Sequence, residues 1–462
     1  MERTTAKKNK YEIDMCNGTI MDKLISFSLP LMLSGILQLM FNAVDIIVVG
    51  RFSGSQALAA VGSTSALINV FTNLFIGISL GANVLTARFY AAGREKEVSE
   101  TVHTAITLAL VSGIVMALVG LVFSKGALAL MGTPDDVIGL SALYMRIYFL
   151  GMPFFMLYNY GAAILRAVGD TKRPLLFLMI AGVINACLNM VLVIVFKLGV
   201  AGVAIATVIS QMISCVLVLR CLCRSESSYR LRFSELGMKG YYLKQIFSVG
   251  VPAGIQSTVI NFSNVLLQSS VNSFGSTAMA GYTAANNLLG FLYVSVNSIT
   301  QACMSFTSQN YGVGKLKRMD RVLADCMILS VVVAVVLGCI CYGFGPEILQ
   351  IYTEDAEVIA CGMEILAYTT ITYFLCGWMD LFPGALRGMG YSAVPMVLSV
   401  IGTVGTRVVW IFGIFPYHRS LAILFISYPA SWIITIVLQV ICFYFVRRRV
   451  HRRSQALAGK EG

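Results

Sequence analysis

The sequence LRAVG at residues 165–169, followed by Pro174, returns 221 residues later as LRGMG at residues 386–390, followed by Pro395. Further landmarks of the two halves keep this register to within one residue: Tyr90, Gly93, Lys96, Pro30 and Asn42 correspond to Tyr311, Gly314, Lys317, Pro252 and Asn264. Self-similarity at a fixed offset is the signature of a duplicated structural unit. The sequence therefore predicts two halves of one fold, at roughly 24–222 and 245–446.

The composition of the chain predicts a membrane protein. Of its 462 residues, 57% are hydrophobic and 12% are charged, whereas soluble domains carry about 25% charged residues. Because so few charges cannot cover the surface of a chain of this length, apolar side chains must face lipid. Apolar runs long enough to cross a bilayer predict twelve transmembrane helices: 24–50, 58–87, 101–124, 141–165, 174–196, 201–222, 245–272, 284–308, 326–348, 364–386, 394–416 and 421–446.

Six predicted helices fall in each half, so both halves enter the membrane from the same side. The predicted fold is an all-α integral membrane protein with twelve transmembrane helices in two parallel six-helix repeats, and we expect a substrate cavity between the lobes. The predicted parts are a cytoplasmic N-terminal tail (1–23), an N-lobe (24–222), a basic cytoplasmic linker (223–244), a C-lobe (245–446) and a basic cytoplasmic C-terminal tail (447–462).

The positive charge of the chain is a signal of orientation. The formal net charge is +12, and 28 of the 34 basic residues fall in the tails and in the connections on one side of the predicted spans. Basic loops stay in the cytoplasm, which places both termini of a multi-pass protein on the cytoplasmic side; the membrane is expected to be the bacterial cell membrane. Anionic lipid is then the expected partner of these charges, and no nucleic acid is needed to explain them.

Polar side chains form stripes on several predicted membrane helices. Ser34, Gln38, Asn42 and Asp45 recur every three to four residues, which places them on one helical face. A polar group in a bilayer faces the bundle interior or a wet cavity, and the alternative role for any single residue is a hydrogen bond between helices. The stripes predict a solvated substrate cavity lined by Gln38, Asn42, Asn261, Asn264, Gln268, Tyr293, Asn297 and Gln301.

Two carboxylates lie well within predicted spans, Asp45 in the first half and Asp380 in the second. A carboxylate in a poorly solvated pocket can exchange a proton or bind a small cation, which is the chemistry of an ion-coupled carrier. The alternative is a carboxylate that forms a structural ion pair with a neighbour such as Arg146 or Arg407, the two basic residues inside spans. Pro30 would weaken the first helix and allow it to bend there.

The sequence offers no group of residues suited to binding a metal or to catalysis. The twelve Cys are scattered through apolar stretches, and the three His stand near span ends or in tails. This pattern predicts no metal site, no cofactor beyond a coupling ion (H⁺ or Na⁺), and no enzymatic constellation of the kind that a membrane-embedded transferase or protease requires.

Four segments of the chain resemble the multidrug and toxic compound extrusion (MATE) family: NAVDIIVVGR at 42–51, ALAAVG at 57–62, LRAVGDT at 165–171 and VINACLN at 183–189. The resemblance implies a V-shaped bundle of two lobes and export of small organic, often cationic, compounds in exchange for H⁺ or Na⁺ by alternating access. The resemblance fits the DNA-damage-inducible-type branch of the family best. The two predicted lobes of equal size fit a protein that functions as a monomer.

The same resemblance assigns roles to individual residues. It implies an N-lobe cation site at Asp45, Asn185, Asn189 and Thr207, and a first helix that bends at Pro30. The chain departs from the family at Asn189, where many relatives carry a second Asp. Asp380 is a further coupling candidate because it is buried in the second half, although its spacing to Arg387 differs from the family pattern.

Two other functions fit parts of the sequence. A flippase for lipid-linked saccharides, from the same superfamily, would line its cavity with several Arg or Lys, and only Arg146 and Arg407 are available. The second alternative function is that of a membrane receptor that does not transport. Two similar lobes with polar stripes on their membrane helices fit alternating access better.

The orientation can be tested with reporter fusions. Because basic connections stay in the cytoplasm, green fluorescent protein joined to the C-terminal tail is expected to fluoresce. Alkaline phosphatase inserted after Thr133, in the connection between the third and fourth spans, is expected to be active. The reverse pattern at both positions would contradict the assigned orientation.

Overall fold

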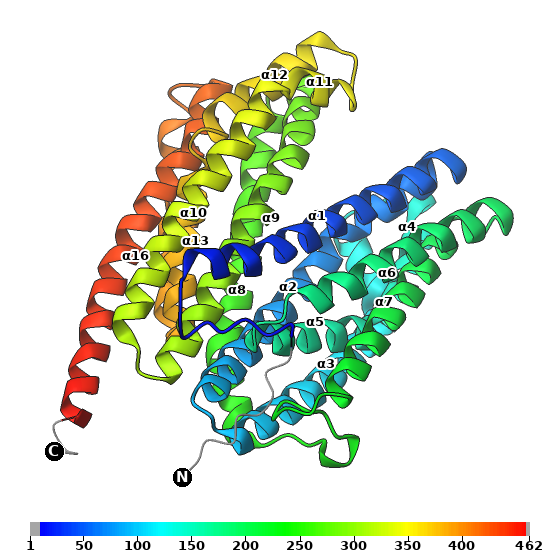
Figure 1. The fold of residues 1–462 in the computed structure, drawn as a ribbon. Helices are drawn as coiled ribbons and strands as arrows, with labels where there is room; N and C mark the ends of the chain where they lie inside the picture. Colours follow the sequence, from blue (N-terminus) through cyan, green and yellow to red (C-terminus); the bar gives the residue numbers. More distant parts are fainter. Residues whose placement is uncertain (1–9, 459–462) are drawn as a thin grey trace. The chain divides into compact units, whose positions relative to one another are not determined.

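The computed structural model describes residues 10–458, and helices make up most of this range (Figure 1). The predicted basic positions Arg3, Lys7, Lys8 and Lys460 lie outside the described residues. Two compact units divide the chain: unit 1 comprises 1–13 and 33–254, and unit 2 comprises 14–32 and 255–462. These units differ from the predicted lobes at their boundaries. Unit 2 includes residues 14–32, which contain the start of the predicted N-lobe, and unit 1 includes residues 245–254, the start of the predicted C-lobe.

Two helices are shared between the units. Helix α1 (Met21–Phe52) gives 21–32 to unit 2 and the remainder to unit 1, while α8 (Gly240–Asn272) gives 240–254 to unit 1 and the remainder to unit 2. Each contains a proline close to the point of exchange, Pro30 in α1 and Pro252 in α8. Proline removes a backbone hydrogen bond from a helix interior and is a common site of kinking.

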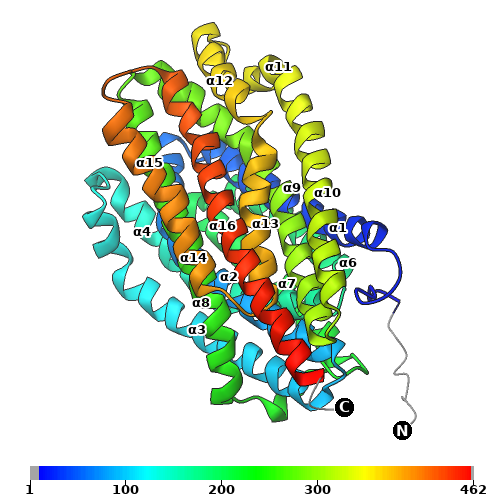
Figure 2. The same ribbon diagram turned by 90° about the vertical axis from the view of Figure 1, so that its left-hand side faces the viewer.

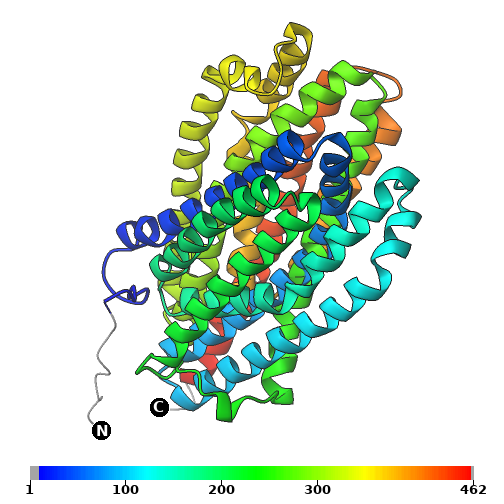
Figure 3. The same cartoon turned by 90° about the vertical axis from the view of Figure 1, so that its right-hand side faces the viewer.

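Unit 1 is built from long helices that pack pairwise. Its elements are α2 (Ser55–Ala91), α3 (Glu95–Leu130), α4 (Asp135–Leu150), α5 (Met152–Ala167), α6 (Lys172–Asn189), the π-helix η1 (Met190–Val195), α7 (Gly199–Cys223) and the short 3₁₀-helix η2 (Phe233–Glu235). Helix α3 packs on α4 and α5, and α6 packs on α7 (Figures 1 and 3). Leu85, Phe149 and Tyr160 belong to the apolar core that these helices enclose.

Unit 2 repeats the arrangement. Its elements are α9 (Ser276–Gly312), α10 (Leu316–Gly343), α11 (Gly345–Gln350), α12 (Ala356–Thr369), α13 (Tyr373–Gly388), α14 (Ala393–Ser399), the π-helix η3 (Val400–Gly405), α15 (Thr406–Val409), the π-helix η4 (Trp410–Ile414) and α16 (Leu421–Ala458). Figure 2 shows α16 running beside α13 and α14, and both pack against it. Leu267, Leu366 and Phe425 belong to its apolar core.

Each of the twelve predicted spans coincides with a helix, a bent pair of helices or a helix with a π-helical continuation. In the described part of the chain, eight helices are long and apolar enough to cross a membrane, or ten spans when two bent pairs are counted. The other two predicted spans are α8 and α9, whose many amide and hydroxyl side chains lower their hydropathy. The fold class is confirmed by this correspondence together with the similarity to solved structures reported below.

The two bent pairs occupy corresponding places in the halves. Helices α4 and α5 meet at 47°, and α12 and α13 meet at 51°, so the predicted single spans 141–165 and 364–386 are each broken. In the first pair the break falls at Gly151, and Pro153 follows in the first turn of α5. Proline has no N–H to continue the preceding helix, which explains why the chain turns there.

The repeat is also seen in the backbone conformation of glycines that lie in turns. Three pairs of glycines with positive φ stand 221 residues apart: Gly54 and Gly275, Gly93 and Gly314, and Gly169 and Gly390. Positive φ is readily accessible to glycine alone. The halves therefore share their turns as well as their helices.

Residues 14–32, the first segment of unit 2, are held by the C-terminal end of α9. The side-chain amide of Asn310 donates to the Met15 carbonyl over 3.1 Å, and the rings of Phe27 and Phe306 meet edge to face at 5.6 Å. Arg318 of α10 donates to the Gly18 carbonyl at 2.8 Å. Residues 14–32 are thus an integral part of unit 2.

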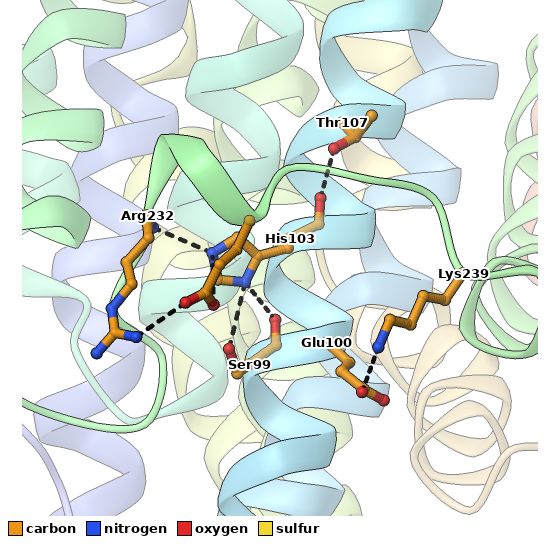
Figure 4. Close-up of polar contacts among 7 residues, drawn as sticks. Ser99, Glu100, His103, Thr107, Arg232 and Lys239 are labelled. Carbon is orange, nitrogen blue, oxygen red and sulfur yellow. Dashed lines mark hydrogen bonds and ion pairs between the residues drawn. The ribbon is translucent and has the colours of Figure 1, made fainter.

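The linker between α7 and α8 is fastened to α3 (Figure 4). The imidazole of His103 accepts the backbone N–H of Arg232 at Nε2 over 3.0 Å, and its Nδ1 lies 2.7 Å from the Ser99 carbonyl. Lys239 forms an ion pair with Glu100, and Arg232 donates to Glu235 over 2.8 Å. This hydrogen bond from Arg232 holds the pKa of the Glu235 carboxyl below its usual value.

Close packing of α2 against the first part of α8 depends on four glycines. Gly77 and Gly81 on α2 and Gly250 and Gly254 on α8 repeat at intervals of four, so they form stripes of small residues. A Cβ added to Gly81 would collide with the backbone of Ile246, and one added to Gly254 would collide with the backbone of Leu74. The two helix backbones approach closely because these positions lack side chains.

This packing generates a stability prediction. Gly81→Val is expected to lower the free energy of unfolding by about 1–3 kcal/mol, the usual effect of overpacking, and to lower the thermal unfolding temperature of the purified protein in detergent. Gly62→Val is the control on the same helix, because nothing lies within 4 Å of a Cβ at Gly62. Equal effects of the two substitutions would contradict the proposed backbone contact.

Candidate functional site

Asp45 lies in unit 1 on α1 and is only 8% exposed. The side-chain amide of Asn189, at the end of α6, donates to Asp45 Oδ1. The hydroxyl of Thr207 on α7 lies 3.4 Å from Asp45 Oδ2 and also donates to the carbonyl of Val203. The structure thus brings Asp45, Asn189 and Thr207 together from three helices, as the resemblance implied.

Asn189 links this carboxylate to a second amide. Its Nδ2 also donates to Oδ1 of Asn185, one helical turn earlier, over 3.1 Å. Both N–H groups of the Asn189 amide are therefore used, while its own Oδ1 is buried and accepts no hydrogen bond from any described residue. A buried acceptor without a donor is costly, so this oxygen marks a place where a cation or a donor would be stabilised.

The helix that carries these amides changes its winding at the site. The π-helix η1 begins at Met190, immediately after Asn189. Such π-helical turns insert an extra residue into a helix and occur often at functional sites. This π-helical turn could not be predicted from the sequence, because the spacing of apolar residues there does not differ from that of an ordinary α-helix.

No described basic side chain forms an ion pair with Asp45. Arg146, one of the two arginines considered as its partner, is exposed, and the other, Arg407, forms its contacts within unit 2. The described residues therefore include no ion-pair partner for Asp45. The site in unit 1 is a buried carboxylate surrounded by neutral polar groups.

Asp380 lies on α13 in unit 2 and is half-buried, without a hydrogen bond or ion pair to any described residue. The nearest basic residue along α13 is Arg387, whose Nη2 donates to Gln256 Oε1 over 2.5 Å. Asp380 therefore belongs to the other unit from Asp45, and its role in coupling stays a prediction.

The predicted cavity residues fall on α1, α8 and α9. Gln38, Asn42 and Asn261 are exposed, and Tyr293 is 45% exposed. Two pairs bond along their own helices, Gln268 to Asn272 at 2.9 Å and Gln301 to Asn297 at 3.1 Å. Asn264 differs from the others because it accepts a hydrogen bond from Arg407. That these side chains line one substrate cavity stays a prediction.

The sequence interpretation missed one buried polar residue and did not distinguish another from an exposed one. Gln256 on α8 is buried and binds Arg387, and its place between Pro252 and Ser257 on a polar helix is a signal that could have identified it. Arg407 was grouped with Arg146, although only Arg407 is buried. Among residues 10–458, no three His, Cys, Asp or Glu side chains gather in a group that could hold a metal ion.

The sequence profile of the MatE family matches this chain twice, at residues 30–191 and 252–412. The chain belongs to the MatE family. The two matches keep the offset of the repeat, which confirms that each half is one copy of the family's structural unit. MatE proteins are transporters rather than enzymes, so the chain is a membrane-spanning transporter. Its place in the DNA-damage-inducible-type branch stays a prediction.

Curated relatives of this MatE protein cover most of its length. Probable multidrug resistance protein YoeA of Bacillus subtilis (strain 168) is 32% identical over 434 residues, 92% of this chain and 93% of the relative. Multidrug export protein MepA of Staphylococcus aureus (strain NCTC 8325 / PS 47) is 22% identical over 382 residues, 82% of this chain and 84% of the relative.

Solved structures support the same fold. A structure described as the outward-facing conformation of a multidrug resistance MATE family transporter of the MOP superfamily matches with a TM-score of 0.87 and 19% identity, covering 97% of this chain and 100% of that one. A second, described as MATE in the bent conformation, matches with a TM-score of 0.83 and 19% identity, covering 94% and 96% of the two chains.

The contact between Asp45 and Asn189 can be measured by a double-mutant cycle. Asn189→Ala leaves a buried carboxylate short of a donor, so it is expected to lower the free energy of unfolding by about 1–3 kcal/mol. In an Asp45→Asn background the same change is expected to have a smaller effect, with a coupling energy of about 0.5–3 kcal/mol. The measurement is denaturant unfolding of the purified protein.

The control cycle replaces Asn159, whose amide bonds to the carbonyl of Phe155 on its own helix. Asn159→Ala and Asp45→Asn are expected to be additive. Additive effects of the Asp45 and Asn189 substitutions would show that the two side chains do not interact.

Proposed function

We propose that this MatE protein is a secondary antiporter that exports organic, often cationic, compounds in exchange for H⁺ or Na⁺. The observation that supports this most is the buried carboxylate of Asp45, which has neutral partners and no basic neighbour. A structural ion pair would have fixed its charge. Instead its negative charge is left for a mobile cation.

The chemistry of the cluster suits reversible cation binding. Asp45 supplies two oxygens, the buried Oδ1 of Asn189 adds an acceptor without a donor, and Asn185 and Thr207 contribute further oxygens nearby. A proton would neutralise the carboxylate directly, whereas Na⁺ would be bound by several of these oxygens. Either ion removes an uncompensated charge from the membrane interior, which makes the helix packing around Asp45 dependent on the bound ion.

The names of the relatives support the substrate class. Both YoeA and MepA are described as multidrug resistance or export proteins, and organic cations are the compounds that a coupled exchange with H⁺ or Na⁺ would move. Alternating access of two lobes built from the same repeat would carry out the exchange. We place the protein in the cell membrane with both termini in the cytoplasm, working as a monomer.

The test is transport of ethidium by the full chain in proteoliposomes, driven in separate arms by a pH gradient and by a Na⁺ gradient. Asp45→Asn keeps the size of the side chain and removes its charge. We expect it to reduce gradient-driven transport at least tenfold, and the arm that drives the wild type identifies the coupling ion. Asp136→Asn, an exposed acidic residue of α4, is the matched control and is expected to transport normally.

Two results would count against the proposal. Undiminished transport by Asp45→Asn together with loss in Asp380→Asn would move coupling to unit 2. No transport of ethidium by wild-type protein under either gradient, when the protein is folded by size-exclusion chromatography, would contradict drug export in exchange for H⁺ or Na⁺.

A further inference from the structure

Arg407 is a buried cation without a carboxylate partner. It lies on α15 in unit 2, is 3% exposed, and forms no ion pair with any acidic residue between 10 and 458. An isolated charge held away from water costs several kcal/mol unless an opposite charge lies close by. The cluster around Arg407 therefore needs compensation that described side chains do not supply.

The guanidinium uses only part of its hydrogen-bonding capacity. Its Nη1 donates to Asn264 Oδ1 over 2.7 Å and to Ser263 Oγ over 3.2 Å, and its Nε lies 3.4 Å from Ser431 Oγ. The Tyr428 ring lies 4.7 Å from its central carbon. The two N–H groups on Nη2 have no described acceptor, so one edge of the guanidinium remains available.

Two neighbours of Arg407 also have hydrogen-bond donors that are not used. The amide nitrogen of Asn264 and the hydroxyl hydrogen of Ser263 have no acceptor among the described residues, while the oxygens of both groups accept from Arg407. The cluster therefore has unused N–H and O–H donors, and its net charge is positive. Such a set of groups stabilises an anion and repels a cation.

The position of the cluster corresponds to that of the cation site in the other half. The 221-residue offset places Arg407 opposite Ala186, beside Asn185, and Ser431 opposite Ser210 on the same helix as Thr207. π-Helices flank both sites, η1 after Asn189 and η3 and η4 on either side of α15. Equivalent places in the two repeats therefore hold opposite charges.

We propose that Arg407, Ser263 and Asn264 form a binding site for a small monoanionic group, a carboxylate or a halide. Such a group would accept from Arg407 Nη2 and from the spare donors of Asn264 and Ser263, and its charge would offset that of the guanidinium. The anion has two possible sources. It is either a carboxylate carried by the transported compound, which rests on the proposed function, or a free anion from solution, which does not.

The first experiment measures anion binding without transport. Trp432 packs against Tyr428, with ring centroids 5.9 Å apart, so its fluorescence can report on the cluster once Trp378→Phe and Trp410→Phe remove the other two tryptophans. We expect bromide, titrated at constant ionic strength against a bulky sulfonate, to quench Trp432 in a saturable manner that acetate competes with. Arg407→Gln is expected to weaken the apparent affinity at least tenfold.

Three further variants keep the result interpretable if Arg407→Gln does not fold. Arg407→Lys retains the charge but loses the planar edge, and Ser263→Ala with Asn264→Leu removes donors without touching the charge; both changes are expected to weaken bromide binding. Arg447→Gln removes an exposed arginine of the same unit and is expected to bind normally. Quenching that is linear, unsaturable and identical in wild type, Arg407→Lys and the Ser263/Asn264 variant would overturn the proposal.

The second experiment identifies the source of the anion. Rhodamine 110 carries a free carboxylate, and rhodamine 123 is its methyl ester, so the two dyes differ in that group alone. A preference of wild type for rhodamine 110 that is lost in Arg407→Gln or Arg407→Lys assigns the site to the transported compound. Equal binding of both dyes, together with saturable bromide binding, assigns it to a free anion. If ethidium is not transported and bromide still saturates, the proposed function fails and the anion site stands.

Discussion

A charge that is kept away from water inside a helix bundle must be balanced, and this requirement organises both halves of the transporter. In unit 1 the charge is the carboxylate of Asp45, with neutral amide and hydroxyl partners; in unit 2 it is the guanidinium of Arg407. Neither has a partner of opposite charge among the described side chains. The protein therefore holds two sites at which a mobile ion or a charged group of a substrate contributes energy that the chain itself does not provide.

The repeat explains how one scaffold supports both sites. Turn glycines, bent helix pairs and π-helices recur at matching places, so the backbone environment is common to the two halves. The charged residues do not recur: Asp45 on α1 has no acidic counterpart on α8, and Arg407 has no basic counterpart near Asn185. Duplication preserved the geometry of the helices while substitution of a few side chains set the sign of the charge.

Much of this could be predicted from the sequence, for physical reasons. Long apolar runs and a fixed offset predict the spans and the repeat, and the spacing of Asn185 and Asn189 places them on one helical face. Their grouping with Asp45 was implied by the family resemblance alone. One feature was missed although Gly151 and Pro153 signal it: the break between α4 and α5, which lies inside a long apolar run. Two features could not be predicted. Turns of π-helix leave no periodic signal, and Arg146 and Arg407 look alike until packing exposes one and buries the other.

The membership of residues 14–32 in unit 2 has a consequence for biosynthesis. These residues leave the ribosome well before the rest of unit 2, because Phe306 and Asn310, which hold Phe27 and Met15, are made almost three hundred residues later. Unit 2 therefore cannot complete its packing while only the first half has been inserted. The opening turns of α1 must wait in the membrane or at its surface until α9 arrives, so final assembly of the second bundle is a late, post-insertion step.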